Sequence, residues 1–214
     1  MIYAVFGFLF GLFIPVIARG YQIYQRSGLM FLFKKKIKKS DKRRKALRHK
    51  FLLSMSMNAL LCMALSYGVF FKFGVENIIW NLGFVWVLLI LMEIDFRMQW
   101  LPDVFVIPLL LFGFLYAVMG SEFVSVGESA IGAILGYFLP FLASLFFIWK
   151  KENVIGGGDI KLLAAVGAWL GMRIPYVIVI SAVIFIIGAL IARKKSGAFG
   201  PAIVISALAV AFCF

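Results

Sequence analysis

Long apolar runs recur along the whole chain, and they constrain its fold more than any other feature. Hydrophobic residues make up 64% of the chain, whereas soluble domains contain only about 45–50%. A run of roughly 20 apolar residues can cross a membrane as a helix, because a helix satisfies its own backbone hydrogen bonds. The sequence therefore predicts an all-α, polytopic membrane protein with about eight transmembrane helices, over residues 1–18, 51–71, 78–94, 104–119, 126–149, 162–171, 174–192 and 198–214.

The distribution of Lys and Arg predicts how these helices are oriented. Of the 22 basic residues, 13 lie between Arg19 and Lys50, in a segment predicted to be a basic cytoplasmic loop at about 19–50. Residues 1–18 precede this charge, the reverse of a cleavable signal peptide, so they are expected to remain as a first helix with the N-terminus outside. The net charge of +13 is concentrated beside the membrane spans. This favours contact with anionic lipids and argues against a nucleic-acid partner.

One predicted helix is short. Residues 162–171 would extend only about 15 Å, which is half a membrane. The segment 162–192 therefore crosses either once or twice. Two crossings, with a turn near residues 172–175, keep the cluster Arg193-Lys194-Lys195 in the cytoplasm, and the positive-inside rule favours that arrangement. All of residues 1–214 is interpreted as a single membrane domain.

Two acids stand at the ends of apolar segments. Asp95 ends the third segment, and Asp159 precedes the short one, so the predicted topology places both at the cytoplasmic leaflet. An acid at membrane depth is by default a functional-site hypothesis. Two carboxyl groups a few ångströms apart do not both ionise readily, so such a pair holds one acid and one base that can activate water. The structural alternatives are a helix cap for Asp159 and an ion pair with Arg97 for Asp95.

The residues around these acids resemble the two motifs of the type IV prepilin peptidases, which are GxGD-type intramembrane aspartic proteases. In the first motif six residues separate Asp95 from Pro102 and Asp103; the second is Gly156-Gly157-Gly158-Asp159-Ile160-Lys161. Phe199-Gly200-Pro201 is similar to an element of the family's last helix. The resemblance covers about residues 78–214, and it implies that Asp95 and Asp159 are a catalytic pair facing the cytoplasm.

The resemblance also implies a substrate and a location. It predicts a multi-pass protein of the bacterial inner membrane that removes the short basic leader from type IV prepilins or pseudopilins. Many members carry paired CxxC elements associated with zinc in the first cytoplasmic loop and methylate the new N-terminus with S-adenosylmethionine. Cys62 and Cys213 have no such companions, so no metal site is predicted. Proteolysis is expected to need no cofactor, and S-adenosylmethionine is required only if the chain also methylates.

The other motif residues are predicted to support the acids. Asp103 begins an apolar segment and is expected to cap its helix rather than act directly. Glu93 points about 200° away from Asp95 on a helix. It is interpreted either as a residue that pairs with another polar side chain for structural reasons or as one that supports the catalytic acids from a second layer. Lys161 either pairs with an aspartate or binds anionic headgroups. Close helix packing within the chain is predicted at Gly7 and Gly11, Gly132 and Gly136, and Gly167 and Gly171.

The three glycines before Asp159 are predicted to be a hinge or a stretch of substrate-facing backbone, because an extended substrate in lipid needs main-chain partners. A different class of function stays open for the two acids. A small proton-coupled transporter could use Asp95 and Asp159 as a proton relay through a broken helix. The combination of the two motifs favours the peptidase, and the Pro102-Asp103 element favours it over a presenilin-type protease.

Overall fold

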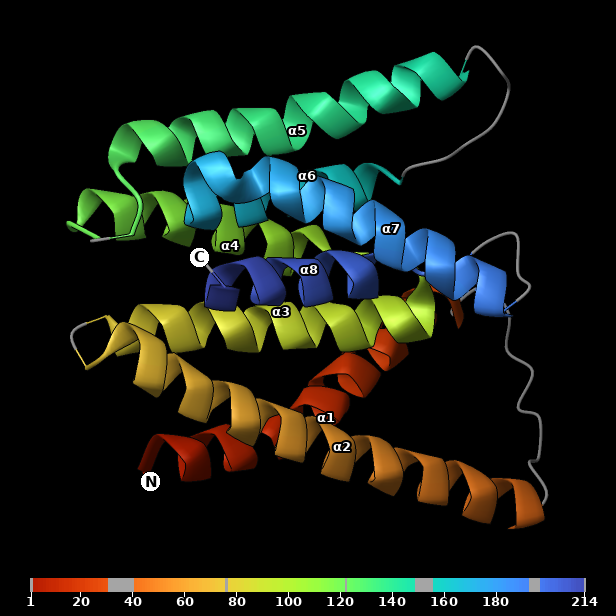
Figure 1. Ribbon diagram of the computed structural model, residues 1–214. Helices are drawn as coiled ribbons and strands as arrows, with labels where there is room; N and C mark the ends of the chain where they lie inside the picture. The colour runs from red at the N-terminus through yellow and green to blue at the C-terminus, as the bar shows by residue number, and fades with distance from the viewer. Residues whose placement is uncertain are drawn as a thin grey trace. The chain divides into compact units, whose positions relative to one another are not determined.

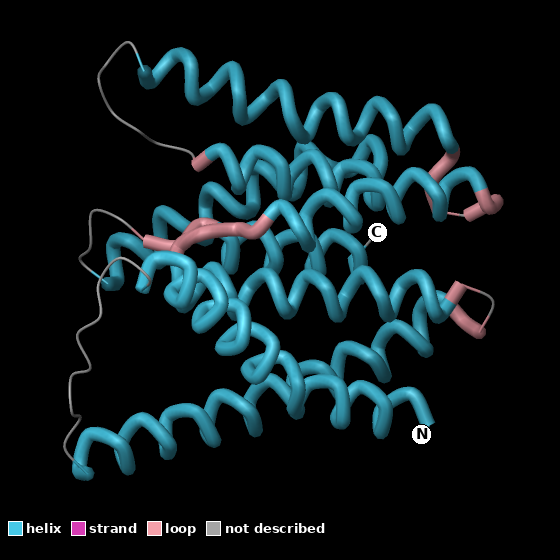
Figure 2. The backbone as a smooth tube through the Cα atoms, turned by 180° about the vertical axis from the view of Figure 1, so that it is seen from behind, coloured by secondary structure: helices cyan, strands magenta, loops and turns pink. Residues whose placement is uncertain are grey.

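The computed structural model of the protein describes residues 2–30, 41–75, 77–121, 123–148, 156–192 and 197–213. Within these residues, helices are the only regular secondary structure, as Figure 2 shows. The prediction of an all-α protein is confirmed. The basic clusters at residues 34–36, 150–151 and 193–195 lie outside the described residues.

Eight α-helices and one 3₁₀ turn follow one another in the described residues, each near a predicted apolar run (Figure 1). They are α1 (Ile2–Met30), α2 (Asp41–Phe73), α3 (Ile78–Met98), α4 (Asp103–Val118), α5 (Val126–Ile148), α6 (Gly157–Leu170), η1 (Gly171–Arg173), α7 (Ile174–Ala192) and α8 (Gly200–Cys213). The chain divides into two compact units, Met1–Ile94 and Asp95–Phe214, and the boundary falls one turn before the end of α3.

The helices extend further into the basic segment than the sequence predicts. α1 continues to Met30 and α2 already begins at Asp41, so the expected loop at about 19–50 is helical at both ends. Lys and Arg are good helix formers, and an apolar run marks only the part of a helix that is long enough to cross a membrane. The cytoplasmic location of this segment and its place in a single domain stay predictions.

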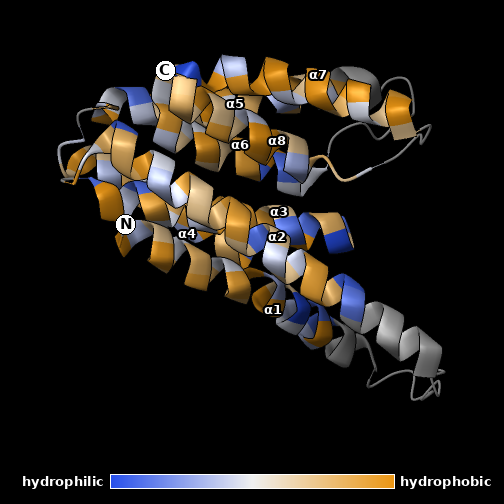
Figure 3. Cartoon of the chain, turned by 60° about the horizontal axis from the view of Figure 1, so that its bottom comes forward, coloured by the Kyte–Doolittle hydropathy of each residue, from blue (hydrophilic) through white to orange (hydrophobic). Residues whose placement is uncertain are grey.

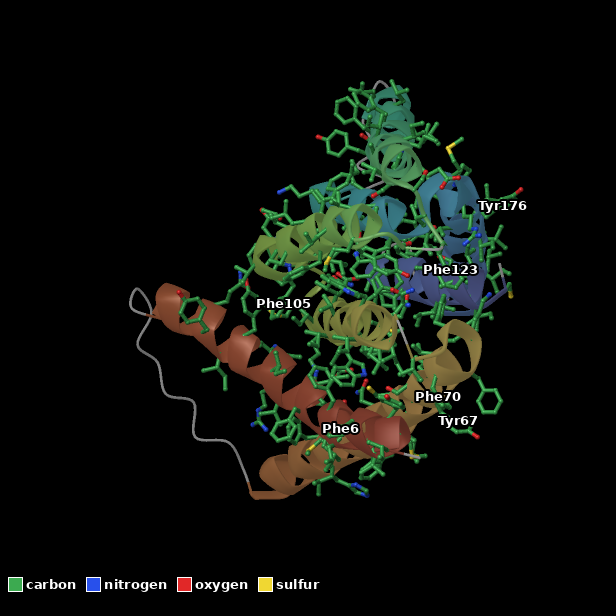
Figure 4. The ribbon with its side chains drawn as sticks, turned by 90° about the vertical axis from the view of Figure 1, so that its left-hand side faces the viewer. Phe6, Tyr67, Phe70, Phe105, Phe123 and Tyr176 are labelled. Atoms are coloured by element: carbon green, nitrogen blue, oxygen red, sulfur yellow. The ribbon has the colours of Figure 1, made fainter. Side chains whose placement is uncertain are left out.

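Five helical stretches are long and apolar enough to cross a membrane: residues 2–25, 49–73, 78–98, 126–145 and 157–192. Figure 3 shows hydrophobic residues along most of each helix. Large apolar side chains also face outward, as Figure 4 shows for Tyr67 on α2 and Tyr176 on α7, which are 47% and 55% exposed. The protein is therefore a membrane protein, whereas the number of crossings and their direction stay predictions.

Glycines let α1 and α2 pack closely in the first unit. A Cβ atom on Gly7 would lie 2.7 Å from Cβ of Ser66, and one on Gly11 would lie 2.6 Å from Cα of Ala59. Neither position has space for a side chain. The prediction that Gly7 and Gly11 serve packing inside the chain is confirmed.

α6 is the central helix of the second unit. It packs against α4, α5, α7 and α8, and ten of its 14 residues are buried. Gly132 of α5 lies directly on Gly167, and a Cβ on Gly132 would stand 2.6 Å from the carbonyl oxygen of Gly171. Gly136 lies in the same way on the backbone of Leu163. The predicted glycine packing is thus confirmed here too, and it fixes α6 along α5.

The chain reverses direction after α6. Gly171 adopts a φ of 58°, which favours glycine, and the turn η1 leads into α7. The rings of Phe185 in the second half of α7 and of Phe199 next to α8 lie 5.2 Å apart. α7 therefore returns toward the end of the unit where α8 begins, and Figure 1 shows α6 and α7 running in opposite directions. This reversal is the one that two crossings require.

Candidate active site

Asp95 lies in the last turn of α3 and is the first residue of the second unit. Asp95 is only 3% exposed, and its Oδ2 accepts a hydrogen bond of 2.8 Å from the backbone N–H of Gly200. Gly200 is the first residue of α8, and the preceding carbonyl of Phe199 accepts the first bonds of that helix. The N–H groups in a first turn lack partners within their own helix. The Asp95 carboxyl group accepts a hydrogen bond from one of these N–H groups, so it caps a helix that begins 105 residues later.

Gly200 touches this carboxyl group so closely that no side chain fits. A Cβ atom there would lie 2.6 Å from Oδ2 of Asp95, 2.9 Å from its Cγ and 3.0 Å from its Cβ. Sequence reasoning did not place Gly200 among the site residues. A signal was available, because Gly200-Pro201 opens an apolar run and proline is favoured in the first turn of a helix.

Asp159 is the third residue of α6, after the N-cap residue Gly156. An acid at this position can reach back to the N-cap backbone, and the Asp159 carboxyl group hydrogen-bonds with the backbone of Gly156. A Cβ on Gly156 would lie 3.0 Å from Oδ2 of Asp159. Asp159 is half-buried, whereas Asp95 is fully buried. The structural alternative that Asp159 caps α6 is wrong as stated, because Gly156 occupies the N-cap position. The Asp159 carboxyl group bonds back to this residue from inside the first turn and stays partly accessible.

The second unit brings the two acids together although 64 residues separate them in the sequence. The charge of Asp95 acts on the carboxyl group of Asp159. Each carboxyl group also faces the start of a helix, α8 for Asp95 and α6 for Asp159, where the helix dipole favours negative charge. Two neighbouring carboxyl groups of this kind can hold one proton between them and act as an acid and a base.

The loop between α3 and α4 lies against the start of α6. Leu101 is 3% exposed, and a Cβ on Gly158 would stand 3.1 Å from the Cβ of Leu101. By contrast, a Cβ on Gly157 would meet nothing within 4 Å. Gly156 is thus the N-cap and Gly157 and Gly158 begin α6, with Gly156 and Gly157 exposed and Gly158 contacted by Leu101. Their use as a hinge or as substrate-facing backbone stays a prediction.

Asp103 and Lys161 form an ion pair between α4 and α6. The Lys161 Nζ lies 2.9 Å from Oδ1 and 2.8 Å from Oδ2 of Asp103. The prediction that Asp103 caps α4 is wrong, since Pro102 occupies the N-cap position and no side chain caps this helix. The nearby cation of Lys161 binds the carboxylate instead. Of the two alternatives for Lys161, pairing with an aspartate is the one observed.

Glu93 takes part in a different set of contacts, within the first unit. Its Oε1 accepts a hydrogen bond of 2.8 Å from Oγ of Ser54, and its Oε2 accepts one of 3.2 Å from Nδ2 of Asn58. These bonds join α3 to α2. The second-layer role of Glu93 stays a prediction. In the described residues no three His, Cys, Asp or Glu side chains come together as metal ligands would, and the predictions about zinc and S-adenosylmethionine remain untested.

The comparisons with known proteins agree with one another. The sequence profile of the type IV leader peptidase family matches residues 82–193. A prepilin leader peptidase/N-methyltransferase of Neisseria gonorrhoeae is 34% identical over 142 residues, which cover 59% of this chain and 49% of that protein. Proteins of the same name from Aeromonas hydrophila and Vibrio cholerae are 41% and 31% identical, over 56% and 61% of this chain and 44% and 54% of theirs.

The matched part is about half the length of these curated relatives. It contains both Asp95 and Asp159, since the family profile runs from residue 82 to residue 193. No solved structure matches the chain significantly.

Proposed function

Because this chain belongs to the type IV leader peptidase family, we propose that it is an intramembrane aspartic endopeptidase that removes the short basic leader of type IV prepilins or pseudopilins. Its apolar helices and its bacterial relatives mark it as a bacterial membrane protein. We place it in the inner membrane, with cleavage at the cytoplasmic boundary. Asp95 and Asp159 are the proposed catalytic residues.

The arrangement that supports this proposal best is the placement of Asp95 and Asp159 in one compact unit, each facing the start of a helix and near enough for the charge of one to act on the other. Proton sharing between two carboxyl groups requires such proximity. Membership of a peptidase family favours proteolysis over the proton-relay alternative for the same pair.

In the proposed reaction, the ionised carboxyl group takes a proton from a water molecule as its oxygen attacks the carbonyl carbon of the scissile peptide. The protonated carboxyl group donates its proton to the carbonyl oxygen, which yields a gem-diol. When the C–N bond breaks, one carboxyl group donates its proton to the departing amine while the other, ionised carboxyl group takes a proton from a hydroxyl of the gem-diol, which becomes the new C-terminal carboxyl group. The pair thus again holds one proton. Both acids serve as donor and acceptor in turn, so neither has a permanent role. Water is the nucleophile, and no cofactor is proposed for this step.

The start of α6 suits an extended substrate. The first N–H groups of a helix have no acceptor within the helix, and the exposed Gly157 leaves open space beside them. A carbonyl oxygen of a substrate main chain could accept a hydrogen bond there. This supports the proposed role of Gly156, Gly157 and Gly158 as substrate-facing backbone.

The test replaces each acid by its amide. Asp95→Asn and Asp159→Asn should each abolish cleavage of a co-reconstituted prepilin, with a loss of at least about 10⁴-fold in kcat, because a single amide cannot exchange the proton. Cleavage is followed by gel shift and by mass spectrometry of the product. A cooperative thermal unfolding transition shows that the variants fold.

A matched control removes an acid from the other end of the same unit. Glu128 lies in the first turn of α5, beside Gly171 at the end of α6, and Glu128→Gln should cleave like the wild type. Substantial cleavage by either Asp variant would refute the assignment of Asp95 and Asp159 as the catalytic pair. The mass of the product N-terminus, recorded with and without S-adenosylmethionine, also reveals whether the chain methylates its product.

A further inference from the structure

We propose that the ion pair between Asp103 and Lys161 is a positioning device that sets the rotation and place of the first turn of α6, and thereby holds Asp159 against Asp95. This inference rests on the proposed function. In this proposal both residues position α6, and neither residue contacts the substrate or the reacting atoms.

The pair links two short stretches of chain, each of which carries one candidate catalytic acid. Asp103 follows Asp95 by eight residues through the loop between α3 and α4, and Lys161 follows Asp159 by two residues on α6. The bridge from Lys161 Nζ to both carboxylate oxygens of Asp103 joins these two short paths. A shift of the first turn of α6 away from the start of α4 therefore stretches this ion pair.

A second contact joins the same two stretches of chain. The backbone and the side chain of Leu101 stand against Gly158, where an added Cβ would lie 3.1 Å from the Cβ of Leu101 and 3.6 Å from its carbonyl oxygen. Leu101 is buried at this place. The loop and the first residue of α4 thus contact the start of α6 at two points, Gly158 and Lys161, which lie one residue before and two residues after Asp159.

The spacing on α6 explains why a rotation matters. Residues two positions apart on a helix point about 200° away from each other. With Lys161 directed toward Asp103 on α4, Asp159 is directed toward the opposite face of α6. Loss of the ion pair would free the first turn, and a carboxyl group that moves by about 1 Å can lose two orders of magnitude in rate.

The ion pair is suited to this role more than to folding. The side chains of Lys161 and Asp103 are 48% and 52% exposed. Exposed ion pairs contribute little to stability, so the helices do not depend on it. Ten buried residues of α6 already hold that helix in the unit. What the pair adds is a fixed geometry at one end.

The experiment measures steady-state cleavage of a co-reconstituted prepilin by Asp103→Asn, Lys161→Gln and the exchanged variant Asp103→Lys/Lys161→Asp. Each single variant should lose up to about fivefold in kcat, the most that an exposed pair can supply, while KM stays within about twofold, because the substrate still binds and the acids are misplaced. The exchanged variant should regain most of the lost kcat, since it restores the pair in reverse. Arg173→Gln is the matched control, because it removes a cation just beyond the other end of α6.

Three outcomes would overturn the proposal. Wild-type kcat in both single variants shows that the pair positions nothing, and failure of the exchange to rescue shows that the residues act separately. A Lys161→Gln defect that appears only in vesicles with anionic phosphatidylglycerol, and not in pure phosphatidylcholine, assigns Lys161 to lipid headgroups. Asp95→Asn and Asp159→Asn are run in parallel. If they are inactive while the pair variants keep wild-type kcat, this inference alone is rejected, whereas activity in the two Asn variants rejects the proposed function itself.

Discussion

The surroundings of Asp95 differ from those of Asp159 in what holds the carboxyl group. Asp95 is 3% exposed and is held by the N–H of Gly200, which comes from a helix 105 residues away in the sequence. Asp159 is half-buried and is held by its own helix, through Gly156 three residues before it. The position of Asp95 thus depends on tertiary packing, and the position of Asp159 on the local start of α6.

This difference predicts unequal freedom for the two acids. The Asp95 carboxyl group is held by burial and by its hydrogen bond to the start of α8, and three atoms of Asp95 lie within 3.0 Å of a Cβ placed on Gly200. Only Oδ2 and Cγ of Asp159 approach a Cβ on Gly156, at 3.0 and 3.8 Å. A side chain end of this kind can rotate away. We expect the reaction to depend on a fixed Asp95 and an adjustable Asp159.

Among substitutions of the glycines that contact the two acids, Gly200→Ala should lower the rate of cleavage most. The new methyl group would collide with the buried Asp95 carboxyl group, so either that group or the start of α8 must shift. We expect kcat for prepilin cleavage to fall about 100-fold, which corresponds to about 2.7 kcal/mol in the barrier. Gly197→Ala is the control in the same loop, because a Cβ there meets only a ring atom of Phe185 at an ordinary 3.7 Å. Equal activity in the two alanine variants would show that Asp95 is not held as tightly as its contacts imply.

Most of the fold could be predicted from the sequence, for a physical reason. Apolar runs near membrane length and an interrupting Gly156-Gly157-Gly158 are local features, and each marks a helix or its start. The same holds for the glycine pairs of α5 and α6, since a missing side chain at four-residue spacing permits close packing. The helical ends of the basic segment 19–50 were not predicted, because Lys and Arg can extend a helix without any apolar pattern that marks it.

The contacts of the candidate site could be predicted only in part. Asp95 and Asp159 are visible because acids are rare in apolar segments. The partners of Asp95 and Asp103 are not visible, since they depend on where α8 and α6 lie after packing. Asp103 shows the limit best. Its position at a helix start predicts a cap, yet a cation that is 58 residues away in the sequence takes the carboxylate.

Asp95→Ala should have an intermediate effect, on stability rather than on rate. It removes the acceptor of the Gly200 N–H, which is buried, and an unsatisfied buried donor costs about 1–2 kcal/mol. Asp95→Asn keeps a side-chain oxygen and should lose less. Thermal unfolding in detergent micelles compares the two variants, both of which should be inactive. If alanine and asparagine lower the melting temperature equally, the hydrogen bond to α8 contributes nothing to stability.

Gly156→Ala should have the smallest effect. Gly156 has φ −71° and ψ 144°, which alanine adopts readily, and the new methyl group meets only the mobile end of Asp159. We expect kcat to fall by about threefold, because the carboxyl group can rotate back into place at little cost. Gly127→Ala is the matched control, since a Cβ on this residue in the first turn of α5 meets nothing within 4 Å. A loss as large as that of Gly200→Ala would mean that Asp159 is held as rigidly as Asp95. It would then make no difference to the reaction that Asp95 is held by a distant helix and Asp159 by its own helix.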